Sequence, residues 1–214
     1  SSVIWNGINE PIQTENNKIN TFRNQIGIND NTVLITLVGR INRWKGQKLL
    51  VNTAEMLINK YKDKIHFLII GSTPPGQDFF KEELLSLISN LKINKYFSVL
   101  DFHKNIDLIW TSSDIAVVPS TEPEPFGYVA IEAMSHKKPV IAANHGGLKE
   151  IVIHNKTGFL FNPNDEKDFS SYLEKLINNK DKRKEFGLSG KNRFCENFTT
   201  NKFISEFEKL YIEC

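Results

Sequence analysis

The fold is decided by one stretch, Pro119-Ser120-Thr121-Glu122-Pro123-Glu124-Pro125-Phe126-Gly127-Tyr128-Val129-Ala130-Ile131-Glu132-Ala133. It follows the apolar run 114–118, which predicts a buried strand. Past the proline-rich loop, the apolar residues Val129, Ala130 and Ala133 form a face typical of a helix that packs on a sheet. The stretch therefore predicts a strand, a loop, a glycine and a helix.

The start of this helix is a predicted anion site. Pro125 stands near the helix entry, where a missing N–H costs little, and Gly127 allows another group to approach the backbone closely. The amides from Phe126 to Val129 would lack intrahelical acceptors at the positive end of the helix dipole. Such a helix terminus binds phosphate groups.

Two carboxylates flank the anion site. Glu124 lies in the loop, and Glu132 lies inside the helix, about 7–8 Å along its axis from Gly127. They could be a general acid and base, acceptors for hydroxyl groups, or a surface glutamate and a helix salt bridge. Glu132 stands in an apolar segment, where a carboxylate needs a partner, while Glu122 reads as exposed. The pattern suits a phosphate ligand with hydroxyl-rich groups on both sides.

Composition excludes several classes of protein. The 214 residues are 40% hydrophobic and 24% charged, which is typical of a globular protein with a core. A net charge of +2 gives no support for nucleic-acid binding. Two cysteines, no Cys/His cluster and no Asp-x-Asp pair predict no metal site, and the apolar runs are shorter than a membrane span. Residues 1–7 have the pattern of a strand and turn from within a longer protein.

Apolar runs alternate with helical patterns along the chain. Strands are predicted at 32–39, 65–71, 96–100, 114–118, 139–143 and 157–161. Besides the helix after Gly127, helices are predicted at 47–61, 78–91, 105–112, 148–153, 165–178, 182–197 and 201–212, and residues 8–31 as a connector with one helical turn. This alternation predicts an α/β fold, a doubly wound parallel sheet that binds its ligand at the carboxyl ends of the strands.

Cationic side chains follow the first predicted strand. Gly39 and Arg40 leave it, and Lys45 comes five residues after the arginine. An arginine fork suits phosphate oxygens, and a lysine adds a point charge. Taken alone, these would be two solvated loop cations, but the neighbouring anion site favours ligand binding.

The histidines differ in their expected roles. His103, next to Phe102, follows the third strand and could reach a ligand through its backbone or its ring. His66 reads as structural, and His136 and His154 read as surface residues.

Together these residues resemble a known family. The motifs are Gly39-Arg40 with Lys45-Gly46, Glu124-Pro125-Phe126-Gly127 with Glu132, and Gly146-Gly147 with Glu150. They resemble the carboxyl-terminal half of a retaining glycosyltransferase of family four, over nearly all of 32–178. The resemblance implies the Rossmann-like carboxyl-terminal domain of a GT-B fold. Residues 1–31 would be the interdomain connector, 32–197 the nucleotide-sugar-binding domain, and 198–214 a helix crossing to an amino-terminal domain.

The resemblance also implies roles for individual residues. Catalytic roles fall to Glu124, facing the donor sugar, and to Arg40 and Lys45, holding the diphosphate. The implied donor-binding residues are Gly39, Phe102, His103, Phe126, Gly127, Tyr128, Val129 and Glu132. Among them, Glu132 would bind the ribose hydroxyls, and the backbone at 102–103 would contact the base.

The implied reaction transfers a sugar from a nucleoside-diphosphate sugar to a hydroxyl acceptor, with retention and without a metal or other cofactor. The acceptor would be a glycan or a lipid-linked glycan bound through the missing amino-terminal domain, in surface polysaccharide or lipopolysaccharide synthesis. Residues 1–214 alone would be inactive. The implied location is cytoplasmic, at the inner face of the cell membrane if the basic run Lys180 to Arg193 contacts lipid rather than solvent.

Alternatives stay open at this stage. The same sheet and glycine turns would serve a nucleotide-sugar epimerase, a glycan phosphorylase or a noncatalytic nucleotide-sugar-binding module. The segments 72–76 and 101–103 depart from the usual family pattern, so the nucleobase is open as well.

Overall fold

Six parallel strands form one sheet in the computed structural model, which describes residues 3–212. The strands are β1 (Val33–Val38), β2 (Ile65–Ile70), β3 (Phe97–Leu100), β4 (Ile115–Val118), β5 (Val140–Ala143) and β6 (Gly158–Phe161). Their order is β3-β2-β1-β4-β5-β6. The chain therefore builds outward from β1 in one direction and from β4 in the opposite direction. A ligand crevice is expected where the direction reverses, at the carboxyl ends of β1 and β4.

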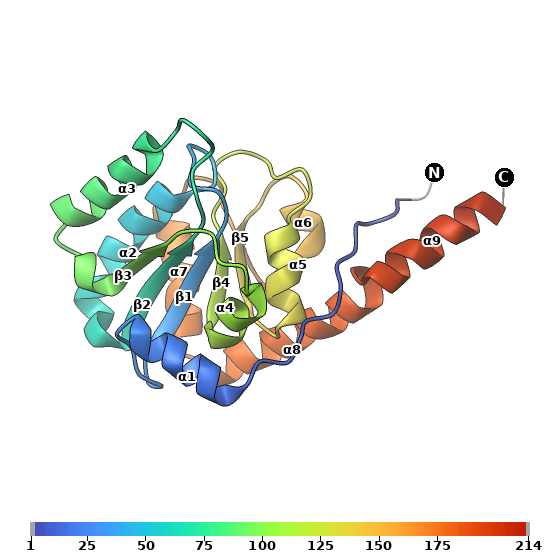
Figure 1. Ribbon diagram of the computed structural model, residues 1–214, viewed down its shortest axis with the longest axis horizontal. Coiled ribbons are helices and arrows are strands. Elements are labelled where there is room, and N and C mark those ends of the chain that lie inside the picture. The colour runs from blue at the N-terminus through green and yellow to red at the C-terminus, as the bar shows by residue number, and fades with distance from the viewer. Residues whose placement is uncertain (1–2, 213–214) are drawn as a thin grey trace.

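Helices cover both faces of the sheet (Figure 1). They are α1 (Asn16–Gln25), α2 (Gln47–Tyr61), α3 (Phe79–Asn90), α4 (Ile106–Ser112), α5 (Tyr128–Ser135), α6 (Leu148–Ile151), α7 (Glu166–Ile177), α8 (Lys180–Asn197) and α9 (Thr200–Ile212). Helices α2, α3 and α7 pack on one face, and α1, α4, α5 and α6 on the opposite face. The predicted doubly wound, Rossmann-like sheet is confirmed.

Most predicted element boundaries agree with the structure to within one residue. The exceptions are α6, which ends two residues early because Val152 is extended, and α8, which begins two residues early. The side chain of Asn179 explains the second difference, because it accepts a hydrogen bond from the amide of Lys182 and so caps α8.

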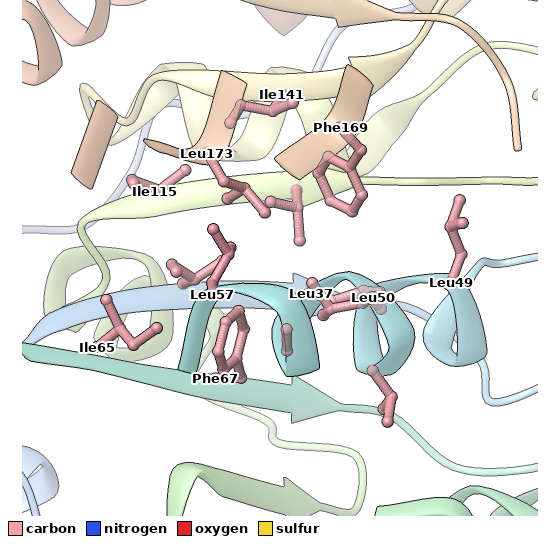
Figure 2. Close-up of a cluster of buried hydrophobic side chains, with 14 of the residues drawn as sticks. Leu37, Leu49, Leu50, Leu57, Ile65, Phe67, Ile115, Ile141, Phe169 and Leu173 are labelled. Atoms are coloured by element: carbon pink, nitrogen blue, oxygen red, sulfur yellow. The ribbon is translucent and has the colours of Figure 1, made fainter. Parts of the chain in front are cut away.

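The larger hydrophobic core lies between the sheet and α2 with α7. Figure 2 shows Leu37 of β1 and Phe67 of β2 beside Leu50 and Leu57 of α2. On the other side of this cluster, Phe169 of α7 is fully buried near β4 and β5. Parallel strands are buried on both faces, which explains why they appear in the sequence as mostly apolar runs.

The connector 8–31 contains the ten-residue helix α1, not the single helical turn that we expected. Its only buried side chains are Phe22 and Arg23, so it lacks the apolar stripe that marks an amphipathic helix. The Arg23 guanidinium donates to the carbonyl of Ser112 at 2.7 Å and to Asp114 at 3.3 Å. Contacts far along the chain, rather than local pattern, therefore place this helix.

The two terminal segments lie side by side (Figure 1). Ile8 donates its amide to the carbonyl of Phe198 at 2.9 Å and accepts from the amide of Thr200 at 3.0 Å. Of the strand and turn expected at 1–7, residues 1 and 2 lie outside the described residues, and 3–7 pair with no strand. Helix α9 projects from the body with exposed apolar side chains at Ile204, Phe207, Leu210 and Tyr211.

Within residues 3–212, every helix is too short or too polar to cross a membrane.

Candidate functional site

Three loops meet at the carboxyl edge of β1, β4 and β5. The amide of Thr121, after β4, donates to the carbonyl of Trp44, after β1, at 2.7 Å. The amide of Gly147, after β5, donates to the carbonyl of Glu124 at 2.8 Å. Backbone hydrogen bonds therefore hold residues that are distant in sequence in one cluster, as the carboxyl ends of neighbouring parallel strands allow.

Two glycines in this cluster are required by its geometry. Gly146 has φ of +54°, and a Cβ there would overlap the backbone of Glu124. Gly127 has φ of +118°, and a Cβ there would stand 2.9 Å from Leu148 of α6. Both positions disfavour any residue with a side chain. The glycines bring the loops after β4 and β5 into contact, so their role is at least partly one of packing.

A pocket of about 670 Å³ opens at the carboxyl ends of β1 and β2. Its lining includes six of the residues predicted from sequence: Gly39, Arg40, Phe102, His103, Val129 and Glu132. Residues from three separate segments are thereby brought together at one site. Its far wall is the proline-rich segment 72–75.

Glu132 is the residue with a carboxyl group in the lining of this pocket. Burial raises the pKa of Glu132, the indole of Trp110 lowers it, and the charge of Asp107 adds to the increase. The Trp110 Nε1 lies 3.5 Å from Oε2, at the long limit of a hydrogen bond. The carboxylate therefore has acceptor capacity that the protein leaves unused.

Donors for an anion stand beside the acid. The Arg40 side chain is exposed and forms no ion pair with any described residue. The amides from Phe126 to Val129 donate to no acceptor in residues 3–212. Gly127 is the N-cap of α5, so these amides point outward at the positive end of its dipole. The pocket thus offers an arginine fork to an anion and a carboxylate to hydroxyl groups, and of the four residues with free amides Val129 lines it.

Lys45 and Glu124 line no part of this pocket and pair with each other. The Lys45 Nζ lies 2.6 Å from Glu124 Oε1, with side-chain exposures of 19% and 6%. The hydroxyl of Ser120 donates to the same oxygen at 2.6 Å. Glu124 is therefore a buried carboxylate with a cation and a hydroxyl as partners. Glu122 is half exposed and paired with Arg43, as its surface assignment predicts.

A second pocket, of about 470 Å³, lies on the other side of the loop after β4. Glu124 and Phe126 line it together with Trp5 and the pair Gly146-Gly147. The sequence motif thus serves two cavities, with Glu132 in the first and Glu124 in the second.

The remaining predicted residues have local roles. The Phe126 ring packs edge-on against Tyr128, which is half exposed, at 5.1 Å between centroids. The Phe102 side chain is 73% exposed, and its amide donates to the Ser72 hydroxyl at 3.1 Å. The His103 Nδ1 accepts from the amide of Asn105 at 3.2 Å, which fixes the ring at the pocket wall.

Sequence reasoning missed the residues that support the two acids. Trp110 is fully buried beneath Glu132, and Ser120 is fully buried beside Glu124. No spacing rule marks either one. The Nε2 of His145, in the loop after β5, donates to the carbonyl of Ser120 at 2.8 Å.

The surface assignment of His136 is wrong. Its side chain is 7% exposed, with Nε2 at 2.9 Å from Asp107 of α4. Its Nδ1 donates to the backbone carbonyl of Glu132 at 2.9 Å. Burial lowers the pKa of His136, against the opposing effects of these two acceptors. The contact with α4 was invisible because 28 residues separate Asp107 from His136 in the chain.

No three His, Cys, Asp or Glu side chains in the described part of the chain are close enough together to hold a metal ion. Metal independence stays a prediction.

The fold and the pocket agree with one family. The family described as "Glycosyl transferases group 1" matches residues 18–193, and the protein belongs to it. The chain is 32% identical over 211 residues to the capsular polysaccharide biosynthesis glycosyltransferase CapM of Staphylococcus aureus, covering 96% of this chain and 52% of CapM. It is 28% identical over 214 residues to a D-inositol 3-phosphate glycosyltransferase of Corynebacterium diphtheriae, covering 98% and 50%.

A solved structure gives the same result. Anabaena Alr3699/HepE in complex with UDP and glucose superposes with a TM-score of 0.91 at 25% identity, over 100% of this chain and 57% of that chain. The chain spans about half the length of these relatives.

Proposed function

We propose that this chain is the donor-binding half of a glycosyltransferase that uses a nucleoside-diphosphate sugar. The observation that carries the proposal is the pocket at β1 and β2, which is lined by an unpaired Arg40, by Val129 with its free amide and by the partly buried Glu132. Arginine and free amides suit a diphosphate, and a carboxylate with unused acceptor capacity suits ribose hydroxyls. The complexes of the neighbour HepE with UDP and UDP-glucose support this ligand class.

Each residue then has a distinct task. Arg40 and the amides near Val129 hold the diphosphate, and Glu132 accepts from the ribose. Lys45 uses one of its three ammonium hydrogens on Glu124, which leaves two for the diphosphate. Glu124 faces the donor sugar. The leaving diphosphate is stabilised by these cations and the helix terminus, with no metal.

The proposal extends to the whole protein. The whole protein transfers the sugar to a hydroxyl of a glycan or lipid-linked acceptor, with retention. The product belongs to a surface polysaccharide or lipopolysaccharide, a setting that the similarity to CapM supports. The acceptor is held by a further domain, to which α9 crosses with its exposed apolar side chains. The enzyme works in the cytoplasm at the inner face of the membrane, and residues 1–214 alone transfer no sugar.

Calorimetry on residues 1–214 tests the donor site. UDP, GDP, ADP and inorganic pyrophosphate are titrated with and without EDTA. We expect one nucleoside diphosphate to bind more tightly than pyrophosphate, with no change on chelation. Failure of all four to bind would refute the site, and a tenfold loss in EDTA would refute metal independence.

Product analysis on the full-length protein tests the reaction. The full-length enzyme is incubated with the donor of the base that binds best and a hydroxyl acceptor. We expect a glycoside whose anomeric proton coupling matches the configuration of the donor. An inverted product would exclude retention, and an epimerised free nucleotide-sugar would point to an epimerase. Transfer by residues 1–214 alone would contradict the need for a second domain.

A further inference from the structure

One oxygen of Glu124 is fully engaged by the protein. Oε1 lies 2.6 Å from both the Lys45 Nζ and the Ser120 Oγ. A serine hydroxyl carries one proton, and a carboxylate only accepts, so Ser120 is the donor. Oε2 accepts from no donor in residues 3–212, while Glu124 lines the second pocket. Oε2 is therefore the oxygen left for a ligand.

Ser120 is itself held in place. It is fully buried, and its carbonyl accepts from Nε2 of His145 at 2.8 Å. A carbonyl only accepts, so His145 carries its proton on Nε2. The amide of Gly147 binds the Glu124 carbonyl from the same loop at 2.8 Å. The loop after β5 thus fixes both the serine and the backbone of the glutamate.

These contacts restrict the Glu124 side chain to one orientation. A carboxylate with a single partner can turn about that contact, whereas two donors on one oxygen and a fixed backbone define the direction of the other oxygen. Both short bonds are charge-assisted, which makes them stronger than neutral hydrogen bonds. Preorganised acceptors avoid the entropic cost of ordering when a ligand binds.

From this geometry we propose that Ser120, held by His145, is a positioning residue that aims Oε2 of Glu124 at the donor sugar. The inference rests on the proposed function, because it requires that a sugar occupies the second pocket. It assigns Ser120 no contact with the nucleotide. Loss of the Ser120 hydroxyl therefore affects what the sugar adds to binding, and not the binding of the nucleoside diphosphate itself.

Calorimetry with UDP and with UDP-glucose tests the inference on residues 1–214. The measured quantity is the affinity for UDP-glucose divided by the affinity for UDP, and this ratio reports the contribution of the sugar to binding. We expect Ser120→Ala to lower that ratio roughly tenfold, as loss of a hydrogen bond to a charged group would, and to leave the UDP affinity within about twofold. His145→Ala should lower the ratio less, because it acts one bond further away.

A double-mutant cycle separates positioning from simple destabilisation. Glu124→Ala should remove the contribution of the sugar, and Ser120→Ala in that background should have no further effect, because its target is gone. Ser113→Ala is the matched control: Ser113 is also buried, and its hydroxyl donates to the carbonyl of Ile109 at 2.7 Å in α4. It should leave the ratio unchanged.

The outcomes are distinguishable. If wild type binds no nucleoside diphosphate, the proposed function fails. If wild type binds UDP but gains nothing from glucose or from any other sugar tested on UDP, this inference fails while the nucleotide site stands. An equal loss of UDP and UDP-glucose in Ser120→Ala, or an effect that persists in Glu124→Ala, also overturns it.

Discussion

Two glutamates eight positions apart have opposite surroundings in this protein. Glu124 is 6% exposed and has two donors at 2.6 Å on one oxygen, one of them a lysine. Glu132 has one indole donor at 3.5 Å, and burial raises its pKa. Both lie between β4 and the end of α5, but they line different pockets.

The difference shows how one motif supplies two kinds of acceptor. Glu124 is fixed in direction by the Lys45 ammonium and the Ser120 hydroxyl. Glu132 keeps its acceptor capacity for a ligand and bears the desolvation that raises its pKa. A buried carboxylate without a cation is costly to folding, so we interpret Glu132 as retained for binding.

Removal of Lys45 should have the largest effect, on stability. Lys45→Ala leaves the buried Glu124 without its cation, and we expect a loss of about 3 kcal/mol in the free energy of unfolding. Lys45→Met with Glu124→Gln should recover most of this loss, because no buried charge remains. Urea unfolding measures both. Lys48→Ala, at an exposed pair with Glu83, is the control and should change stability little.

Removal of Glu132 should affect affinity instead. We expect Glu132→Ala to weaken UDP by about 1.5–3 kcal/mol, the value of a charged hydrogen bond, or roughly ten- to hundredfold. Inorganic pyrophosphate should bind as before, because it has no ribose. Calorimetry with both ligands is the measurement, and Glu122→Ala is the control at an exposed glutamate. An equal loss of pyrophosphate would mean that Glu132 shapes the phosphate loop.

The pH dependence of nucleotide binding should follow Glu132. Its pKa is raised, so the carboxyl takes up its proton at a higher pH than a free glutamate. The ribose contribution should be complete above the raised pKa and be lost as pH falls through it. UDP affinity from pH 8 to pH 5 should therefore fall more steeply for wild type than for Glu132→Gln; titration of the UDP phosphates cancels in this comparison. Parallel profiles would contradict the assignment.

The smallest effect is expected at Trp110. Trp110→Phe removes the long contact to Glu132 but keeps an aromatic ring in the core. We expect a loss of UDP affinity of at most about 1 kcal/mol, because the contact is long and therefore weak. A loss as large as that in Glu132→Ala would show that the indole, rather than burial, determines the properties of the carboxylate.

The fold was predictable from the chain, apart from α1. Runs such as 115–118 are apolar throughout because both faces of a parallel strand are covered, and the local sequence shows this directly. Helix α1 depends on Arg23, whose acceptors include Ser112, 89 residues away. No local pattern encodes such a contact.

The meeting of the loops after β1, β4 and β5 at one edge of the sheet was predictable, but the presence of two cavities there was not. The sequence gives the order of Glu124, Gly127 and Glu132, and a parallel sheet gathers their loops at one edge. The two glutamates line different pockets because of the three-dimensional geometry of the loops, which includes the close approach of Gly146 to the Glu124 backbone. The supporting partners Ser120 and Trp110 were missed for the same reason.

The strand order has a consequence for how the chain is made on the ribosome. β1 is synthesised before the other strands of this sheet, yet its second edge pairs with β4, which emerges some 80 residues later. Until then that edge is an open template in an apolar strand, and open edges invite pairing with other chains. During the same interval the Arg23 guanidinium and the Leu34 amide lack the acceptor that Asp114, the residue directly before β4, provides in the folded protein. Nascent chains that stall before β4 should therefore be the form most prone to aggregate.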